Sequence, residues 1–239
     1  TKSDSGVWIL NPSVANTFTG NINANGGALG LTSNGIGTAG NVALSNGEIF
    51  AFGGPLTTST NFILTNNATA VFGGSNSITV NGTLTKAAGA NDQTISNNLE
   101  NGAVLTFNGN FIDGESTANA TRTISMRGYG ATVFNGQIQN NTTTVTNVLK
   151  LDIRLSNDGS VTLGGNNQAA NSFTGGILLG QGTLIVTNTA ALGLAANTLT
   201  LDGGVLTSTV DLSGANKLVN AAVNIQGDPV TFSGTNNIE

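Results

Sequence analysis

Two carboxylates and a guanidinium stand close together in one short segment, at Asp152, Arg154 and Asp158. A pair of carboxylates can serve as acid and base in the hydrolysis of a glycosidic bond. A sugar-cleaving groove usually also contains several aromatic side chains, and this chain has one Trp and one Tyr. We therefore interpret this segment as a solvated, salt-bridged face or loop, with glycan cleavage or binding as the alternative.

Two further groups of charged residues lie upstream. Asp113 and Glu115 can supply the hard oxygen ligands that calcium prefers. The glycine- and aspartate-rich nonapeptide of calcium β-rolls is missing around them, so we expect a loop instead. Arg122 and Arg127 flank Met126 near Tyr129 and could bind an anion or a glycan, although an interface or solvent-facing role fits them better.

Composition excludes most catalytic chemistry. The 239 residues contain no His and no Cys, which removes imidazole bases, thiolate nucleophiles, Cys/His zinc sites and disulfides. Seven Lys and Arg against twelve Asp and Glu give a net charge of −5, which argues against nucleic-acid binding. We expect no enzyme activity, no cofactor and no metal site. No apolar run approaches the ~20 residues of a transmembrane helix, so we expect no transmembrane segment.

The elements that carry these residues are expected to be short strands. Only 8% of the residues are charged and 34 are Gly, so helix-forming windows are rare. Apolar residues alternate with Thr in several runs, which is the period of a strand with one buried face. These runs cover residues 78–80, 83–85, 104–107, 161–163 and 199–201.

Asn-Gly pairs separate the predicted strands, and such pairs tolerate the positive φ of a sharp turn. They are Asn25-Gly26, Asn34-Gly35, Asn46-Gly47, Asn81-Gly82, Asn101-Gly102, Asn108-Gly109 and Asn135-Gly136. An antiparallel sandwich with hairpins and a parallel β-helix both fit this pattern. Strands of three to five residues, with two or three turn signals in about 20 residues, favour the β-helix.

The sequence also repeats itself. Residues 16–22 return as residues 171–177, residues 27–32 as 182–187, and residues 42–47 as 199–204. Repetition at this scale is typical of a solenoid, because each unit buries its apolar face against the next.

The second copy carries a set of motifs along residues 163–206. They are Gly165-Asn166-Asn167, Phe173-Thr174-Gly175-Gly176, Gly182-Thr183-Leu184, Ala190-Ala191-Leu192-Gly193 and Leu199-Thr200-Leu201-Asp202-Gly203-Gly204. This segment resembles the autotransporter-associated β-strand repeat, also called the passenger-associated transport repeat, and a weaker copy covers residues 16–50. The resemblance implies a right-handed parallel β-helix in a secreted or bacterial cell-surface protein. It carries over no catalytic residue, because the motif is structural.

We therefore predict a single β-helix domain over residues 1–239, with roughly a dozen coils of about 20 residues each. Residues 1–15 are predicted to form an N-terminal cap or assembly segment. Terminal coils expose strand edges that pair readily with another chain. The residues predicted to take part in such assembly are Val7, Trp8, Ile9 and Leu10 at one end, and Val223, Ile225, Val230 and Phe232 at the other.

These features favour a non-enzymatic extracellular or bacterial cell-surface protein, a structural or adhesive passenger or a filament subunit that polymerises end to end. Its expected partners are further copies of the chain, a surface glycan or a host-cell ligand. A carbohydrate-active β-helix enzyme or glycan-binding module is the first alternative. An ice-binding solenoid is the second, suggested by the Thr-x-Thr pairs at Thr17, Thr83, Thr121 and Thr198.

Overall fold

A computed structural model describes residues 1–239 except 66, 90, 142–146, 157, 165–169 and 220–221. The described strands form three sheets of ten, six and eight strands, and every strand pairing is parallel. Helix makes up 3% of the chain. The predicted parallel β-helix is confirmed, and the antiparallel sandwich is excluded.

We call the three sheets A, B and C. Sheet A contains β2 (Ile22–Ala24), β4 (Asn41–Leu44), β7 (Asn61–Leu64), β10 (Leu84–Lys86), β13 (Phe111–Asp113) and β16 (Ile138–Gln139). Sheet B contains β1 (Val7–Leu10), β3 (Ala28–Leu31), β5 (Glu48–Ala51), β8 (Thr69–Gly74), β11 (Gln93–Leu99), β14 (Thr121–Gly128), β17 (Val148–Arg154), β19 (Ile177–Gln181), β21 (Thr198–Leu201) and β23 (Ala222–Ile225). Sheet C contains β6 (Leu56–Thr58), β9 (Ile78–Val80), β12 (Val104–Phe107), β15 (Ala131–Phe134), β18 (Ser160–Leu163), β20 (Thr183–Val186), β22 (Val205–Ser208) and β24 (Thr231–Ser233). The described residues also form two short helices, α1 (Ser33–Ile36) and the 3₁₀ helix η1 (Gly214–Asn216).

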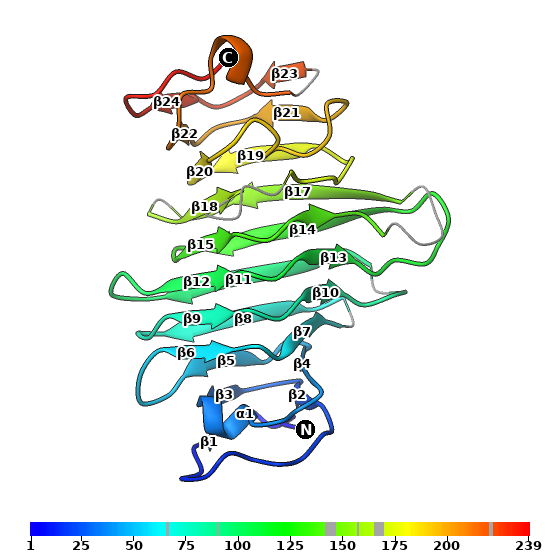
Figure 1. The fold of residues 1–239 in the computed structure, drawn as a ribbon, viewed down its shortest axis with the longest axis vertical. Helices are drawn as coiled ribbons and strands as arrows, with labels where there is room; N and C mark the ends of the chain where they lie inside the picture. The colour runs from blue at the N-terminus through cyan, green and yellow to red at the C-terminus, as the bar shows by residue number, and fades with distance from the viewer. Residues whose placement is uncertain (66, 90, 142–146, 157, 165–169, 220–221) are drawn as a thin grey trace.

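The coils stack along the long axis of the molecule, with the two termini at opposite ends (Figure 1). They number about eight rather than the predicted dozen. The reason is that the coils are longer than expected. Val7 aligns with Ala28, 21 residues further on, whereas Gln93 aligns with Ile124, 31 residues further on. The long coil includes the connection between β13 and β14, which the strand pattern could not reveal.

The number of sides changes along the solenoid. The first two coils use sheets B and A, and α1 occupies the position that sheet C takes from β6 onward. Thr32 caps α1 by accepting a hydrogen bond from the backbone N–H of Gly35 (3.0 Å). Among the described strands, sheet A ends at β16, and later coils use sheets B and C.

The sequence repeat predicts strands correctly but not their sheets. Ile22 begins β2 of sheet A, whereas its counterpart Ile177 begins β19 of sheet B. The predicted motif residues Gly165, Asn166 and Asn167 lie outside the described residues.

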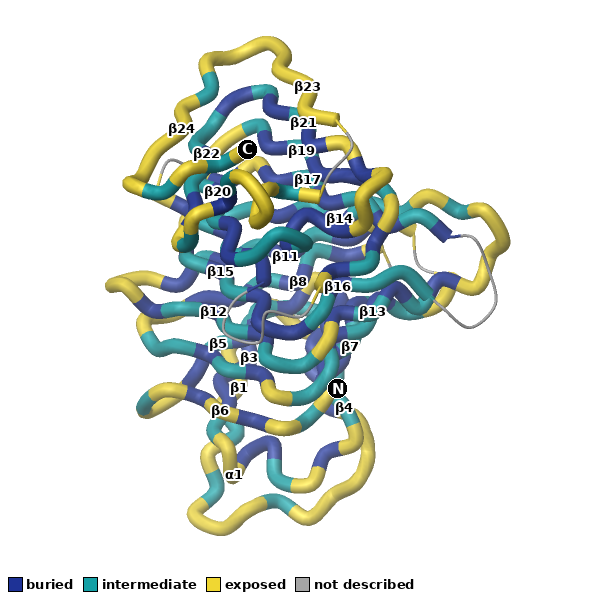
Figure 2. Tube along the Cα trace, turned by 45° about the horizontal axis from the view of Figure 1, so that its top comes forward, coloured by how far each residue is buried: buried dark blue, intermediate teal, exposed yellow. Residues whose placement is uncertain are grey.

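One continuous hydrophobic core fills the solenoid, because alternate residues of each strand point inward. Figure 2 shows buried segments lining the interior and an exposed last coil at β23 and β24. Aromatic rings lie against one another at the centre. The ring centroids of Phe107 and Phe134 are 5.2 Å apart, and those of Phe62 and Phe72 are 6.3 Å apart. Such contacts between successive coils hold the stack together.

Asparagine side chains form a ladder at one corner, where the chain leaves sheet C. The Nδ2 group of Asn108 donates to Oδ1 of Asn81 (2.7 Å), and that of Asn135 donates to Oδ1 of Asn108 (2.6 Å). Each amide therefore joins two coils along the axis.

The glycine after each ladder Asn has a different role from the one predicted. Gly82, Gly109 and Gly136 do not have positive φ. A Cβ atom on any of them would lie less than 3.0 Å from a backbone oxygen of the preceding coil. Glycine is required there for close stacking, not for a left-handed turn. Among the predicted Asn-Gly pairs, positive φ is found at Asn46 (66°), Asn101 (55°) and Gly102 (76°).

Candidate functional site

The predicted N-terminal assembly residues form β1 at one edge of sheet B. Trp8 and Leu10 align with Leu29 and Leu31, both buried, so the two side chains extend the inward rows of the solenoid. Trp8 remains 48% exposed. Val7 and Ile9 take the alternate, outward positions and are also exposed.

Lys2 covers part of this end. Its side chain is 1% exposed, and its Nζ lies 2.6 Å from Oδ1 of Asp4 and 3.2 Å from the carbonyl oxygen of Gly26. The same ammonium lies 5.7 Å from the centroid of the Trp8 ring, within the range of a cation–π contact. The hydrogen bond from Lys2 lowers the pKa of Asp4.

The predicted C-terminal assembly residues form the opposite end. Val223 and Ile225 on β23 align with buried Leu199 and Leu201, and Phe232 on β24 aligns with buried Leu206. These side chains continue the inward rows, yet they are 56%, 63% and 57% exposed, respectively. Val230 is half-buried and packs against the core. In the described residues, one apolar face of this coil has no coil on top of it.

A cavity of about 360 Å³ lies inside this last coil. It is lined by Leu192, Leu199, Leu206, Lys217, Leu218, Val223, Phe232, Ile238 and Glu239. Its mostly apolar lining and its place under the exposed rows indicate a coil that is incompletely packed.

The outer face of sheet C is uncharged across all eight strands. Its residues lie in two rows of register partners. The rows are Thr57, Thr79, Thr106, Val133, Thr162, Ile185, Thr207 and Ser233, and Val104, Ala131, Ser160, Thr183, Val205 and Thr231. All are half-buried or exposed. The face is therefore an array of hydroxyl and methyl groups.

The Thr pairs singled out in the sequence do not form this array. Thr85 lies in sheet A, Thr123 and Thr200 lie in sheet B, and Thr17 lies outside the strands. Thr123 aligns with Lys150, so charged side chains interrupt its row. The aligned hydroxyl groups belong to other residues, which become neighbours only through the register of the coils.

Asp152 and Asp158 do not form a carboxylate pair in one groove. Asp152 lies on the outer face of β17, where its Oδ2 accepts from Nη2 of Arg127 (2.7 Å) and its Oδ1 from Nε of Arg154 (3.2 Å). Asp158 lines a separate cavity. The salt-bridged face predicted for this segment holds for Asp152 and Arg154, and Arg127 is already paired.

The cavity beside Asp158 was not predicted. It has a volume of about 540 Å³, and Glu100, Tyr129 and Asp158 supply its functional groups. The hydroxyl of Tyr129 donates to Oε1 of Glu100 (3.3 Å). Partial burial and the carboxylate of Glu100 raise the pKa of Tyr129. The cavity therefore holds one aromatic ring and two carboxylates, and the sequence did not predict it because Glu100 and Asp158 are 58 positions apart.

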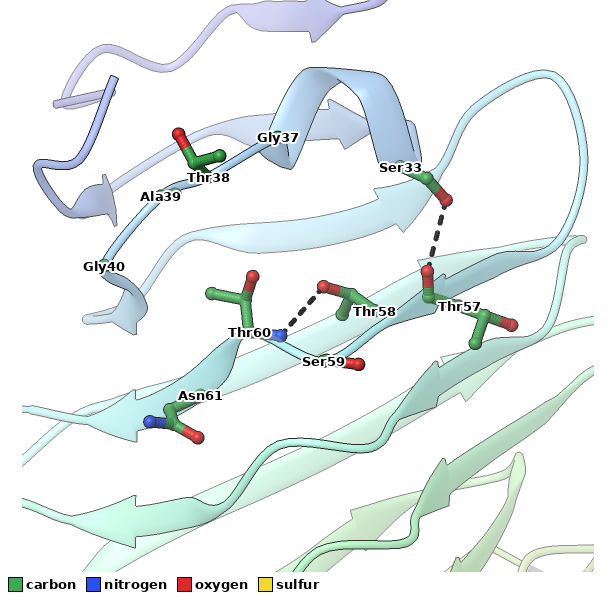
Figure 3. A pocket seen from close by; sticks show the side chains of 10 residues that line it. All are labelled: Ser33, Gly37, Thr38, Ala39, Gly40, Thr57, Thr58, Ser59, Thr60 and Asn61. Carbon is green, nitrogen blue, oxygen red and sulfur yellow. Dashed lines mark hydrogen bonds between the residues drawn. The ribbon is translucent and has the colours of Figure 1, made fainter. Parts of the chain in front are cut away.

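A second surface cavity, of about 450 Å³, lies between α1 and the turn from β6 to β7 (Figure 3). Its lining contains hydroxyl groups, an amide and glycines, and no titratable side chain. Ser33 on α1 donates to the carbonyl oxygen of Thr57 (3.1 Å), and the N–H of Thr60 donates to Thr58 Oγ1 (3.1 Å). Such a lining can form hydrogen bonds but offers no acid or base.

Four charged residues meet inside the corner between sheets A and B. Lys86, Asp113 and Glu115 are 0% exposed. Nζ of Lys86 lies 3.4 Å from Oδ1 of Asp113 and 3.6 Å from Oε2 of Glu115, and Nε of Arg122 donates to the same Oε2. Asp113 and Glu115 are therefore neutralised by the chain's own cations and do not form an exposed calcium loop.

Backbone groups also hold Glu115. Its Oε1 accepts hydrogen bonds from the N–H groups of Ser116 (2.9 Å) and Thr117 (2.8 Å). Burial alone would raise the pKa of Glu115, but the N–H of Thr117, the guanidinium of Arg122 and the charge of Lys86 outweigh it. The pKa of Glu115 is lowered to about 2.

Sequence reasoning missed this cluster because its members are separated along the chain by up to 36 positions, from 86 to 122. One signal was present. Lys86 closes the alternating run of 84–86 at a position that should point inward, and an inward Lys requires a buried acidic partner.

Neither a metal site nor a membrane-spanning helix is found among the described residues. Within the described residues, no three His, Cys, Asp or Glu side chains lie close enough together to hold a metal ion. No helix in the described part of the chain is long and apolar enough to cross a membrane.

The chain matches no family model, no curated protein and no solved structure.

Proposed function

We propose that this protein is a non-enzymatic, extracellular structural solenoid, a surface passenger or filament subunit, that associates through its end surfaces. The observation that carries the proposal is the exposed inward rows of the last coil. Val223, Ile225 and Phe232 occupy positions that are buried in every preceding coil they align with. Covering these half-exposed apolar side chains removes apolar surface from water and so favours a contact at this end.

The opposite end offers a matching surface. β1 and β23 lie at the two ends of the same sheet, so a second copy placed head to tail would continue sheet B. Trp8 and Leu10 would then extend the inward rows that Val223 and Ile225 leave open. Since a head-to-tail contact does not close on itself, it generates a filament.

Two features support an extracellular place for this rod. The repeat in residues 163–206 resembles that of autotransporter passengers. The chain has seven Lys and Arg, and Lys2 and Lys86 are buried, which supports resistance to proteases that cleave after basic residues. Arg127, Asp152 and Arg154, on the outer face of sheet B, are engaged in ion pairs, which supports a structural rather than a catalytic role.

Association through the ends can be tested with matched charge insertions on one strand. We expect the wild-type chain to form longer rods as concentration rises, measured by sedimentation velocity and electron microscopy. Val223→Lys places a charge in the inward row and should abolish the longer species. Asn224→Lys places the same charge on the outer face of β23 and should leave them intact.

Two results would count against end association. One is a wild-type chain that stays a single short rod at the highest concentration reached. The other is an equal effect of both lysine variants, which would indicate general charge repulsion instead of a specific end contact.

The outer face of sheet C favours ice binding as a second candidate function. Its two rows carry hydroxyl and methyl groups repeated at the strand spacing of about 4.8 Å, without a charge. Such a surface can order water along a plane. Thermal hysteresis of the wild-type chain, lost in Thr162→Lys on this face and kept in Thr200→Lys on sheet B, would establish it. No hysteresis in the wild type would exclude it.

A further inference from the structure

The pair Lys86 and Asp113 is the most unusual charged contact in the described structure. The two residues are register partners on neighbouring strands, β10 and β13, and both side chains are 0% exposed. Their closest atoms, Nζ and Oδ1, are 3.4 Å apart. Charge-assisted hydrogen bonds are normally about 2.7–2.9 Å long, so the pair is close but poorly bonded.

Both members of the pair lack good hydrogen-bond partners. Nζ of Lys86 forms one hydrogen bond, at 3.4 Å, to the carbonyl oxygen of Ala87. Oδ2 of Asp113 is buried and accepts no hydrogen bond from the described residues. A buried ion pair with unmet bonds is costly, because desolvation is not offset.

We propose that Lys86 and Asp113 condense to a covalent amide, an isopeptide crosslink between two successive coils. A proton passes from the Lys86 ammonium to Oδ2 of Asp113, giving an amine and a carboxylic acid. The amine nitrogen attacks Cγ of Asp113, and the C–O bond to Oδ2 breaks. Oδ2 leaves as water with two of the three ammonium protons, and the third stays on the amide nitrogen. Charge and atoms balance without an added reactant.

The groups around Lys86 and Asp113 can form hydrogen bonds with the amide product. Oδ1 of Asp113 already accepts a hydrogen bond from the N–H of Glu115 (3.1 Å), as the carbonyl oxygen of an amide would. Oδ2, which has no partner, is the oxygen that leaves. The new N–H has two acceptors nearby, the carbonyl oxygen of Ala87 and Oε2 of Glu115.

Glu115 is also placed to assist the attack of the Lys86 nitrogen on Cγ of Asp113. Its carboxylate is fixed by Arg122 and by two backbone N–H groups, with Oε2 3.6 Å from the Lys86 nitrogen. A fixed negative charge there stabilises the positive charge that the nitrogen carries as it bonds to Cγ. Strand register holds the two reacting groups together, and exclusion of water favours condensation over hydrolysis.

The experiment is the intact mass of the purified, folded chain, followed by peptide sequencing in a mass spectrometer. We expect a mass lower than that of the sequence by one water molecule, and a branched peptide containing both Lys86 and Asp113. Lys86→Met should restore the full mass. Asp113→Asn should lose ammonia instead of water, since the leaving group becomes the amide nitrogen. Glu115→Gln should slow the loss of water, measured from the time of refolding.

Lys150→Met is the matched control, because Lys150 lies on the outer face of β17 and should leave the linked peptide unchanged. The sequence Asp113-Gly114 can also lose water by forming a cyclic imide, so the branched peptide decides. A wild-type chain that yields separate, unlinked peptides for Lys86 and Asp113 overturns the proposal, whatever its intact mass. This result needs no variant that might fail to fold.

Discussion

Individual charged residues are few in this protein, and each described ion pair has a definite structural role. Lys2 closes one end beside Trp8, Arg127 and Asp152 join β14 to β17, and Lys86 lies in the core with Asp113. The charges of Lys86, Asp113 and Glu115 interact more strongly than those of an exposed ion pair, because water does not screen them.

Glu115 should make the stability of the folded chain depend on acid. Its pKa falls from the ordinary 4.5 to about 2 on folding. A carboxyl whose pKa is lowered contributes stability above its unfolded pKa and loses it as pH falls through its folded pKa. We therefore expect the urea midpoint of the wild type to fall between pH 4.5 and pH 2 more steeply than that of Glu115→Gln. Parallel curves for the two proteins would contradict this assignment.

At the scale of the elements, the segments that form strands were predictable, but which strands pair with each other was not. Alternation in residues 104–107 predicted β12 and its inward Leu105 and Phe107, because one strand contains that information. The row joining Thr106 to Val133 and Thr162 depends on coil lengths, which vary with the connections between strands. The exposed end residues were predictable for the same reason as the strands. The buried Lys86 cluster was not, since it arises only when coils stack.

Close stacking at the Asn-Gly corner gives a sharp prediction at this scale. Gly109→Ala places a Cβ against backbone oxygens of the coil below, and backbone cannot move aside as a side chain can. We expect a loss of about 1–3 kcal/mol in the free energy of unfolding, measured by urea denaturation.

Gly20→Ala is the control, because its added Cβ has no atom within 4 Å and its φ is not positive. It should change stability little. An equal loss of unfolding free energy in both variants would show that the corner is no more sensitive to an added Cβ than the open surface is.

The whole molecule is a stack in which each coil contacts chiefly its neighbours, and protection should therefore increase from the ends toward the middle. Lys217 lies exposed near η1, in the connection that leads to the last coil. Lys86 lies buried in the central three-sided part.

Limited trypsin digestion under native conditions should show this gradient. The first cut is expected after Lys217, and no cut is expected after Lys86 in the folded chain, with fragments identified by mass. Lys217→Gln should delay the first cut without changing the fate of Lys86. Early cleavage after Lys86 in the native protein would contradict the buried placement of its side chain.

The uneven coil lengths also determine how the rod would respond to a pull on its two termini. Each strand is hydrogen-bonded only to strands of the coils above and below it, so the coils would detach one at a time. Each release would lengthen the tether by an amount set by that turn, roughly 70 Å for the 21 residues from Val7 to Ala28 and roughly 90 Å for the 27 from Thr121 to Val148. A force–extension trace would therefore show a series of unequal steps, each set by the number of residues in one coil.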